Sequence, residues 1–222
     1  MSNPAHAHET SAPRLELFCK LQGETVPFIA KANIPTQFGK FTVYGFLEHK
    51  TGKEHLAIVC GEIDARKRIP VRIHSECWTG DVLGSLKCDC RAQLEAALTH
   101  VAEHGGMVLY LRQEGRGIGL LNKLKAYALQ EQGMDTVEAN HALGFPDDLR
   151  SYECAVQMLK FFGIHQVKLL TNNPKKIGAL EDAGIHVERE RHQLEANPHN
   201  LRYLKTKARK SGHLLDFEEE AL

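Results

Sequence analysis

The sequence has no net charge and no long hydrophobic run. Its 222 residues contain 28 lysines and arginines and 28 aspartates and glutamates, so no net positive field favours non-specific binding to nucleic acid or to a membrane surface. No stretch approaches the roughly 18 apolar residues of a membrane span, and residues 1–13 lack the apolar core of a signal peptide. We therefore expect a cytoplasmic protein that binds neither nucleic acid nor membrane.

Cysteines are few, and a reducing compartment excludes a disulfide framework. The six cysteines are then ligands, nucleophiles or core residues. Three stand alone and are expected to be small buried residues: Cys19, Cys60 and Cys154.

The other three cysteines, Cys77, Cys88 and Cys90, lie within fourteen residues. On an extended or turning backbone, side chains at positions i and i+2 point the same way, so Cys88 and Cys90 can reach one metal while Cys77 approaches from a preceding loop. Structural zinc takes four protein ligands, whereas catalytic zinc takes three and a water. The pattern predicts one catalytic Zn²⁺ per chain, held by three cysteines and a water. Two alternatives remain: three reduced core cysteines, or a structural site with His74 as the fourth ligand.

The hydrophobic pattern predicts a mixed α/β protein in which a β-rich N-terminal part precedes alternating helices and strands. The composition, 42% hydrophobic and 25% charged, is that of an ordinary globular protein. Expected strands are 40–46, 54–60, 71–74, 107–111, 167–170 and 185–188. Expected helices are 92–103, 120–132, 152–162, 174–182 and 199–210.

These elements indicate a single compact domain over residues 30–215. Residues 1–29 are expected to form an N-terminal extension whose first thirteen residues are disordered, and residues 216–222 an acidic tail.

A glycine-rich loop, Arg112–Gly119, follows one buried strand and precedes a helix. Glycines allow close approach of the backbone to a ligand, and exposed amides favour anions. The carboxylate of Glu114 can accept two hydrogen bonds from a guanine edge or a ribose. The alternative is a plain turn between strand and helix.

A second candidate anion site lies in Leu170–Lys176. Asn173 can cap a helix with Pro174 at its first position. Lysines at a helix N-terminus oppose the dipole unless an anion is present, so Thr171 and Lys176 are expected to hold a phosphate. The alternative is an ordinary cap with solvated lysines.

The segment Asp147–Arg150 places two carboxylates beside an arginine. A loop salt bridge is the default interpretation. A role at a reacting phosphate is the alternative, because magnesium prefers one or two carboxylates together with substrate phosphates.

Together these segments resemble the GTP cyclohydrolase II family, from about residue 30 to residue 215. The resemblance is carried by ordered blocks of sequence: Arg72–Cys77, Thr79–Asp81, Cys88–Cys90, Gln93–Ala97, Arg112–Arg116, Ile118–Lys123, Ala126–Gln130, Asp135–His141, Leu143–Phe145, Leu169–Lys176 and Gly212–Leu215. It implies hydrolysis of GTP to 2,5-diamino-6-(5-phosphoribosylamino)pyrimidin-4(3H)-one with release of formate and pyrophosphate, the first step of riboflavin biosynthesis. It also implies Zn²⁺, Mg²⁺ with the GTP phosphates, and a homodimer.

The resemblance assigns roles to single residues. It implies zinc on Cys77, Cys88 and Cys90, with Asp148 as base, Arg150 as nucleophile and Tyr127 as an active-site tyrosine. It implies that GTP is bound by Arg72, Ile73, His74, Ser75, Glu76, Gln93, Glu114, Gly115, Arg116, Thr136, Thr171 and Lys176.

One implied role conflicts with simple chemistry. An arginine stays protonated, with a pKa above about 12, and is a poor nucleophile unless Asp148 removes its proton in a dry pocket. The alternative is that Arg150 only stabilises the α-phosphate and that water attacks directly.

Three residues depart from what is usual in the family: Arg91, Trp78 and Gly117. Glycine is expected at the position of Arg91, a smaller aliphatic residue at Trp78 and often asparagine at Gly117. Arg91 directly follows the last zinc ligand, so its charge is expected to lower the pKa of the bound water or to crowd the site.

Two other functions remain as alternatives. One is a divergent paralogue that releases the formamide intermediate or feeds another pathway. The other is a GTP-binding regulator with structural zinc. Tyr127 argues against the first, and the set of Tyr127, Asp148 and Arg150 argues against the second.

Overall fold

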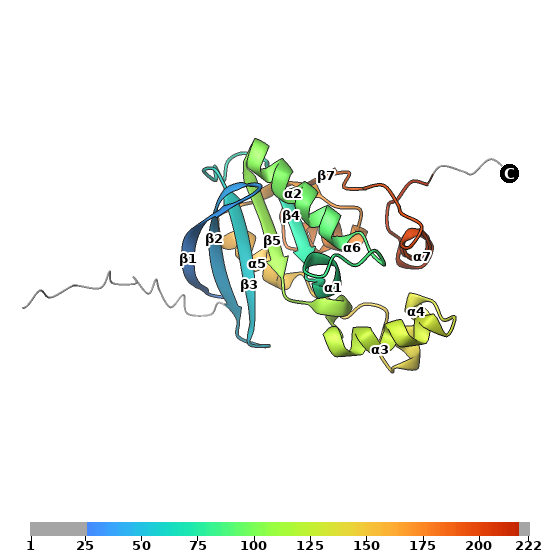
Figure 1. The fold of residues 1–222 in the computed structure, drawn as a ribbon. Helices are drawn as coiled ribbons and strands as arrows, with labels where there is room; N and C mark the ends of the chain where they lie inside the picture. Colours follow the sequence, from blue (N-terminus) through green and yellow to red (C-terminus); the bar gives the residue numbers. More distant parts are fainter. Residues whose placement is uncertain (1–25, 218–222) are drawn as a thin grey trace, which may run out of the picture.

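One seven-stranded sheet forms the centre of the computed structural model, which describes residues 26–217 (Figure 1). The strand order is β1-β2-β3-β5-β4-β6-β7. The strands are β1 (Phe28–Thr36), β2 (Gly39–Glu48), β3 (Lys53–Cys60), β4 (Ile69–Ser75), β5 (Gly106–Leu111), β6 (Gln166–Leu170) and β7 (His186–Glu190). The expectations for residues 1–13 and for the last five residues of the tail lie outside the described residues.

The helices are α1 (Trp78–Asp81), α2 (Cys90–His104), the 3-10 turn η1 (Glu114–Gly117), α3 (Leu120–Glu131), α4 (Thr136–Ala142), α5 (Glu153–Phe161), α6 (Pro174–Glu181) and α7 (Leu201–Ser211). The short helices α1 and α4 were not predicted, and α3, α4 and α5 follow one another before β6, so helices and strands alternate only from α5 onward. The neighbouring strands β1, β2, β3 and β5 pair antiparallel, whereas β5, β4, β6 and β7 pair parallel. The predicted mixed α/β fold is confirmed.

Side chains of the central strands alternate between two hydrophobic layers. In β5, Met107 and Leu109 pack in the layer that also holds Met158 of α5. Val108 points to the opposite face, where it packs with Val101 of α2. The sheet is therefore covered on both faces, as expected for its parallel half.

Strand β1 was not predicted from the sequence, because its residues do not alternate between buried and exposed positions. Eight of its nine residues are exposed, including Ile29 and Ile34, and Pro35 lies within it. Among the described residues it is an edge strand that pairs only with β2, so backbone hydrogen bonds hold it rather than a buried face. It begins at Phe28, two residues before the expected start of the domain.

The parallel strands place the candidate site. Their carboxyl ends point toward α1, α3 and α4 (Figure 1), and ligands in such sheets bind beyond the carboxyl ends of the strands. Asn173 caps α6 by accepting from the Lys175 amide, and Pro174 occupies the first turn, as predicted.

None of the helices in the described residues is long and apolar enough to cross a membrane.

Candidate active site

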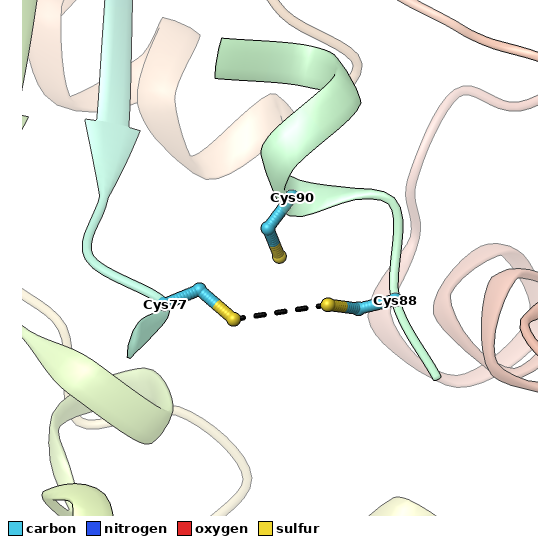
Figure 2. Close-up of side chains that lie close together, drawn as sticks. All are labelled: Cys77, Cys88 and Cys90. Carbon is cyan, nitrogen blue, oxygen red and sulfur yellow. Dashed lines mark hydrogen bonds between the residues drawn. The ribbon is translucent and has the colours of Figure 1, made fainter. Parts of the chain in front are cut away.

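Three cysteine sulfurs converge beyond the end of β4. Cys77 precedes α1, Cys88 lies in the turn before α2, and Cys90 begins α2 (Figure 2). The three sulfurs lie within 4.8 Å of one another, and Cys77 Sγ is 3.8 Å from Cys88 Sγ. Tetrahedral zinc with Zn–S bonds of about 2.3 Å requires sulfurs about 3.8 Å apart. The donors and their spacing therefore fit zinc.

Gly80 makes room for this convergence. A Cβ atom at this position would lie 3.0 Å from Cys88 Sγ and 3.1 Å from Cys77 Sγ. Real Cβ atoms rarely approach so closely, so any larger residue would displace the sulfurs. Glycine is needed here for space, and the cysteine spacing gave no signal of it.

The electrostatics of the cluster favour one thiolate and two thiols before a metal binds. Hydrogen bonds from the Cys88 and Cys90 thiols, together with the Lys123 ammonium, lower the pKa of Cys77. The hydrogen bond with Cys77 raises the pKa of Cys88 to about 11 and raises that of Cys90. Metal binding would therefore release protons from the remaining thiols.

Lys123 links the cysteines to the glycine-rich loop. Its Nζ donates to Cys77 Sγ at 3.0 Å and to Glu114 Oε1 at 2.9 Å. Burial opposes its charge, but the Cys77 thiolate and Glu114 raise the pKa of Lys123 above its usual range. This lysine is a functional residue that the sequence-based assignment missed.

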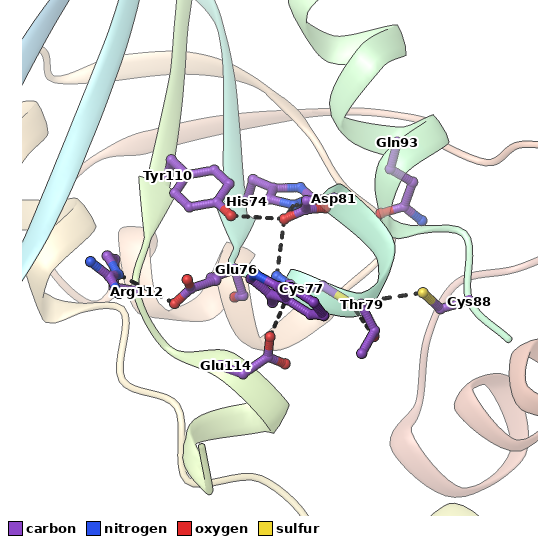
Figure 3. A network of polar contacts seen from close by, with 12 residues as sticks. His74, Glu76, Cys77, Thr79, Asp81, Cys88, Gln93, Tyr110, Arg112 and Glu114 are labelled. Carbon is purple, nitrogen blue, oxygen red and sulfur yellow. Dashed lines mark hydrogen bonds and ion pairs between the residues drawn. The ribbon is translucent and has the colours of Figure 1, made fainter. Parts of the chain in front are cut away.

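Glu114 fixes the backbone next to the cysteines. One carboxylate oxygen accepts from the amide of Trp78 (Figure 3). The other accepts from the Gly115 amide and from Lys123. Both oxygens are therefore engaged within the protein, although Glu114 also lines the cavity described below.

Asp81 orders the loop from the opposite side. Its carboxylate accepts from the Cys77 amide at 3.0 Å and from the Tyr110 hydroxyl at 2.9 Å, and lies 3.1 Å from His74 Nε2 (Figure 3). His74 is thus directed at Asp81. Within the described part of the chain no fourth metal-binding side chain joins the three cysteines, which disfavours the structural alternative with His74 as a ligand.

The cysteines open into a cavity of about 380 Å³. Burial raises the pKa of Tyr127, in its wall, to about 12, so the phenol stays protonated and can donate. Thr136 Oγ1 is buried without a hydrogen-bond partner and is free to bind a ligand. The predicted site residues in this cavity are Ser75, Glu76, Cys77, Cys88, Cys90, Glu114, Gly115, Arg116, Tyr127, Thr136 and Arg150.

A smaller pocket of about 90 Å³ adjoins the cavity and is lined by several cationic side chains. The two share Ser75, Cys90, Arg116, Arg150 and Tyr203. The predicted residues in the smaller pocket are Arg72, His74, Ser75, Gln93, Arg116, Arg150, Thr171 and Lys176. We call it the phosphate pocket, because its cations suit an anion.

Arg72 and Lys176 are buried at the base of the phosphate pocket. Arg72 donates to the Leu170 carbonyl at 2.8 Å and to the side chain of Gln93, and burial lowers its pKa to about 10. Lys176 donates to the Ile73 carbonyl at 2.7 Å, and burial, reinforced by Arg72, lowers its pKa. A bound anion would favour the charged form of both groups.

Asp148 and Arg150 form a bidentate ion pair. Arg150 Nε and Nη2 each lie 2.8 Å from a different Asp148 oxygen. Burial opposes the charge of the guanidinium, but the Asp148 carboxylate raises the pKa of Arg150. The salt bridge expected as the default is present, with Asp148 as its acid, while Asp147 pairs with His141.

Two predicted residues do not face the cavities. The side chain of Ile73 is fully buried in the core, and only its carbonyl contacts a site residue, Lys176. Asp148 lines neither cavity, and its carboxylate pairs with Arg150.

The structure explains one of the three unusual residues and places the other two. Arg91 is half exposed on α2 and pairs with Glu95 at 2.9 Å. Trp78 donates its backbone amide to Glu114, which any other residue except proline could do, and its side chain is exposed, so nothing in the structure explains the tryptophan. Gly117 has φ +95°, and a Cβ there would lie 2.9 Å from Leu149 Cβ, so asparagine would clash in this chain.

A second cluster, Glu48, His55 and Cys154, brings potential ligand atoms within 4.8 Å of one another. His55 Nδ1 accepts from the Arg112 amide at 3.1 Å, which places the proton of the neutral ring on Nε2, facing Glu48 at 3.6 Å. That nitrogen then has no lone pair for a metal. Burial raises the pKa of Cys154 to about 12, so the cluster is a buried polar network.

Two of the three isolated cysteines lie among the described residues. Cys154 is buried as expected, whereas Cys60 is half-buried. Cys19 lies outside the described residues.

Comparisons with known proteins agree with this geometry. A model of the GTP cyclohydrolase II family matches residues 28–192. The GTP cyclohydrolase-2 of Azotobacter vinelandii is 57% identical over 193 residues, which cover 86% of this chain and 93% of that protein. The GTP cyclohydrolase-2 of Citrobacter koseri is 56% identical over 189 residues, which cover 84% and 96%.

A longer relative also matches. The riboflavin biosynthesis protein RibBA of Bacillus subtilis is 57% identical over 187 residues, which cover 83% of this chain and 47% of that protein. The family match includes all three converging cysteines and extends through β7. The chain belongs to the GTP cyclohydrolase II family.

Proposed function

We propose that the protein hydrolyses GTP to 2,5-diamino-6-(5-phosphoribosylamino)pyrimidin-4(3H)-one, releasing formate and pyrophosphate, as the first step of riboflavin biosynthesis. One observation carries the proposal: three cysteine sulfurs with zinc spacing open into a cavity that shares lining residues with a cation-rich pocket. A purine ring beside the sulfurs would leave its phosphate chain among the cations.

Zn²⁺ is the proposed cofactor of the cysteine cluster. When bound to three cysteines, zinc supplies an activated water at neutral pH, which is the chemistry that attack on the purine C8 and on the resulting formamide requires. Tyr127 remains protonated in the cavity wall and is the proposed proton donor to the reacting group. Lys123 and Asp81 hold Cys77 from two sides and orient it.

We assign guanosine to the larger cavity and the triphosphate to the phosphate pocket. Glu76, Gly115, Arg116 and Thr136 line the first, and the unpaired Thr136 hydroxyl supports a direct contact. Arg72, Gln93, Thr171 and Lys176 line the second. Mg²⁺ is proposed to enter with the phosphates, because it binds substrate phosphates more readily than an all-protein cage.

Arg150 is proposed to bind the α-phosphate as a cation, with water as the attacking group. The bidentate contact with Asp148 and the raised pKa of the guanidinium support this role, because a more firmly protonated arginine is a poorer nucleophile. Asp148 then orients Arg150 and balances its charge.

The decisive experiment is incubation of the zinc-loaded protein with GTP and Mg²⁺, followed by product identification. Equimolar formate, pyrophosphate and the deformylated pyrimidine are expected. Pyrophosphate with retention of the formyl group would favour the divergent paralogue. Tight GTP binding without either product would favour the nucleotide-binding regulator.

A homodimer in the cytoplasm completes the proposal. Exposed apolar side chains on the segment after Cys77 and on α3 support an interface: Trp78, Val82, Leu83, Leu86, Leu121 and Leu124. Light scattering of the purified protein at several concentrations tests the dimer. A monomer mass at all concentrations would exclude it.

A further inference from the structure

The C-terminal segment 201–215, comprising α7 and the residues after it, closes one side of the phosphate pocket. It lies beyond residues 28–192, which match the family model, and in Figure 1 α7 lies on the opposite side of the molecule from β1. The segment contributes Tyr203, Leu204, Lys207, His213 and Leu215 to the pocket wall.

Specific contacts fasten this segment to the site. The Leu214 amide donates to the Asn172 carbonyl at 2.8 Å, directly after β6. Lys207 Nζ lies 3.3 Å from Asp89 Oδ1, and Asp89 stands between two of the cysteines. The segment therefore contacts both the phosphate-binding strand end and the predicted zinc loop.

The charges around the pocket are unbalanced. Five cationic side chains line it, namely Arg72, Arg116, Arg150, Lys176 and Lys207. Asp89 is the only carboxylate among the described residues of the lining. Lys207 is itself largely buried, with 13% of its side chain exposed, so solvent screens its charge weakly.

Buried side-chain atoms without a hydrogen-bond partner also indicate an anion in the phosphate pocket. Among the buried side-chain atoms of residues 26–217 that have no hydrogen-bond partner are Arg72 Nε, Asn172 Nδ2 and His213 Nδ1. All three residues line the phosphate pocket. Buried polar atoms without partners are costly, and an anion with several oxygens would satisfy them together.

We propose that Lys207 and His213 bind the phosphate chain of the substrate, so that segment 201–215 is part of the active site. This inference rests on the proposed function for the identity of the substrate, although the pocket's preference for a polyphosphate is independent of turnover. Lys207 supplies a charge-assisted contact, and the neutral ring of His213 donates from Nδ1. In the ligand-free protein the Lys207–Asp89 contact keeps α7 in place.

The test uses the full-length, zinc-loaded protein and inorganic triphosphate as the probe, with binding measured by calorimetry. Lys207→Gln is expected to weaken triphosphate binding roughly 10- to 100-fold, the usual loss for one charge-assisted contact. Lys205→Gln is the matched control on the same helix, since Lys205 lines neither cavity, and it should change binding less than about twofold. Lys207→Arg should recover most of the affinity.

His213 is tested in the same way. His213→Phe removes the donor and is expected to weaken triphosphate binding, whereas His213→Asn keeps a donor near the position of Nδ1 and should retain it. Inhibition of GTP turnover by guanosine, which has no phosphate, should be unchanged in all these variants.

Different experimental results would contradict the inference and the proposed function. If the wild type releases formate from GTP but Lys207→Gln binds triphosphate as tightly as Lys205→Gln, the inference is overturned. If Lys207→Gln weakens the binding of guanosine and of triphosphate equally and also loses zinc, the inference is overturned too, because Lys207 would then act only on the fold. If the wild type releases no formate, the proposed function fails, and triphosphate binding still decides the role of Lys207.

Discussion

The ammonium of Lys123 lies 3.0 Å from the sulfur of Cys77, and the same group lies 2.9 Å from Glu114. Three thiolates around Zn²⁺ carry a net negative charge, which a buried ammonium offsets. The sequence suggested that Arg91 would place a positive charge beside the cysteines, but Arg91 is half exposed and pairs with Glu95 on α2. The cation at the site therefore comes from α3.

Replacing Lys123 with methionine should weaken zinc binding. The substitution removes the donor to Cys77 and leaves the buried Glu114 carboxylate without its cation. Loss of a group that orients a metal ligand typically costs about 10- to 100-fold in metal affinity. Competition with a chelator measures the affinity, and Lys125→Met, on the same helix but exposed, is the control. Equal zinc affinity in the two variants would contradict the assignment.

Gly80→Ala should also impair zinc binding, for a steric reason. The new Cβ would meet Cys88 Sγ at 3.0 Å and Cys77 Sγ at 3.1 Å, so the sulfurs must separate. We expect substoichiometric zinc and at least about a tenfold loss of affinity. Gly178→Ala is the matched control, because nothing lies within 4 Å of its added Cβ, and it should stabilise α6 slightly. Full zinc occupancy in Gly80→Ala would refute the steric explanation.

Arg91→Ala should leave zinc affinity and turnover nearly unchanged. The guanidinium is half exposed and pairs with Glu95 on its own helix, and alanine is a strong helix former. Zinc titration and kcat/KM for GTP are the measurements, with a change below about twofold expected for a surface substitution. A larger shift in either quantity would show that the arginine charge reaches the metal site.

Arg150 should form no covalent adduct with the nucleotide. The Asp148 carboxylate keeps the guanidinium protonated, and a protonated guanidinium has no lone pair available for attack on phosphorus. Intact-protein mass spectrometry of a reaction stopped during turnover is the measurement, with Arg150→Lys as the comparison. A species heavier by one guanylyl group in the wild type alone would establish the covalent route.

Stability should fall with decreasing pH from near neutrality. Burial lowers the pKa of His192 and of His213 from 6.5 to about 3, so below pH 6.5 the unfolded chain binds more protons than the folded protein. This contribution is fully present above pH 6.5 and is lost as the pH falls toward 3, by at most about 1.4 kcal/mol per pH unit for each histidine. Urea unfolding at several pH values measures it. His192→Gln should have a shallower dependence, and an identical slope would contradict the assignment.

The sequence alone determined the local features of the protein. The β-branched and apolar runs predicted six of the seven strands, and glycine and proline signals placed the helix ends within one or two residues. The Cys77, Cys88 and Cys90 spacing predicted a three-ligand group, and the structure brings those sulfurs together. The Asn173 cap could be predicted because a helix cap depends on residues that are neighbours along the chain.

Which distant groups meet depends on how the elements pack in three dimensions. Lys123 contacts Cys77, Asp81 bonds Tyr110, and Lys207 reaches Asp89 across 118 positions. Nothing in the local pattern around Lys123, Asp81 and Lys207 distinguishes them from ordinary surface charges. Strand β1 was missed for a related reason: its partner β2 provides the backbone hydrogen bonds, and no buried face marks its sequence. Periodicity and capping reflect interactions along the chain, whereas contacts across the sheet ends depend on how the elements pack.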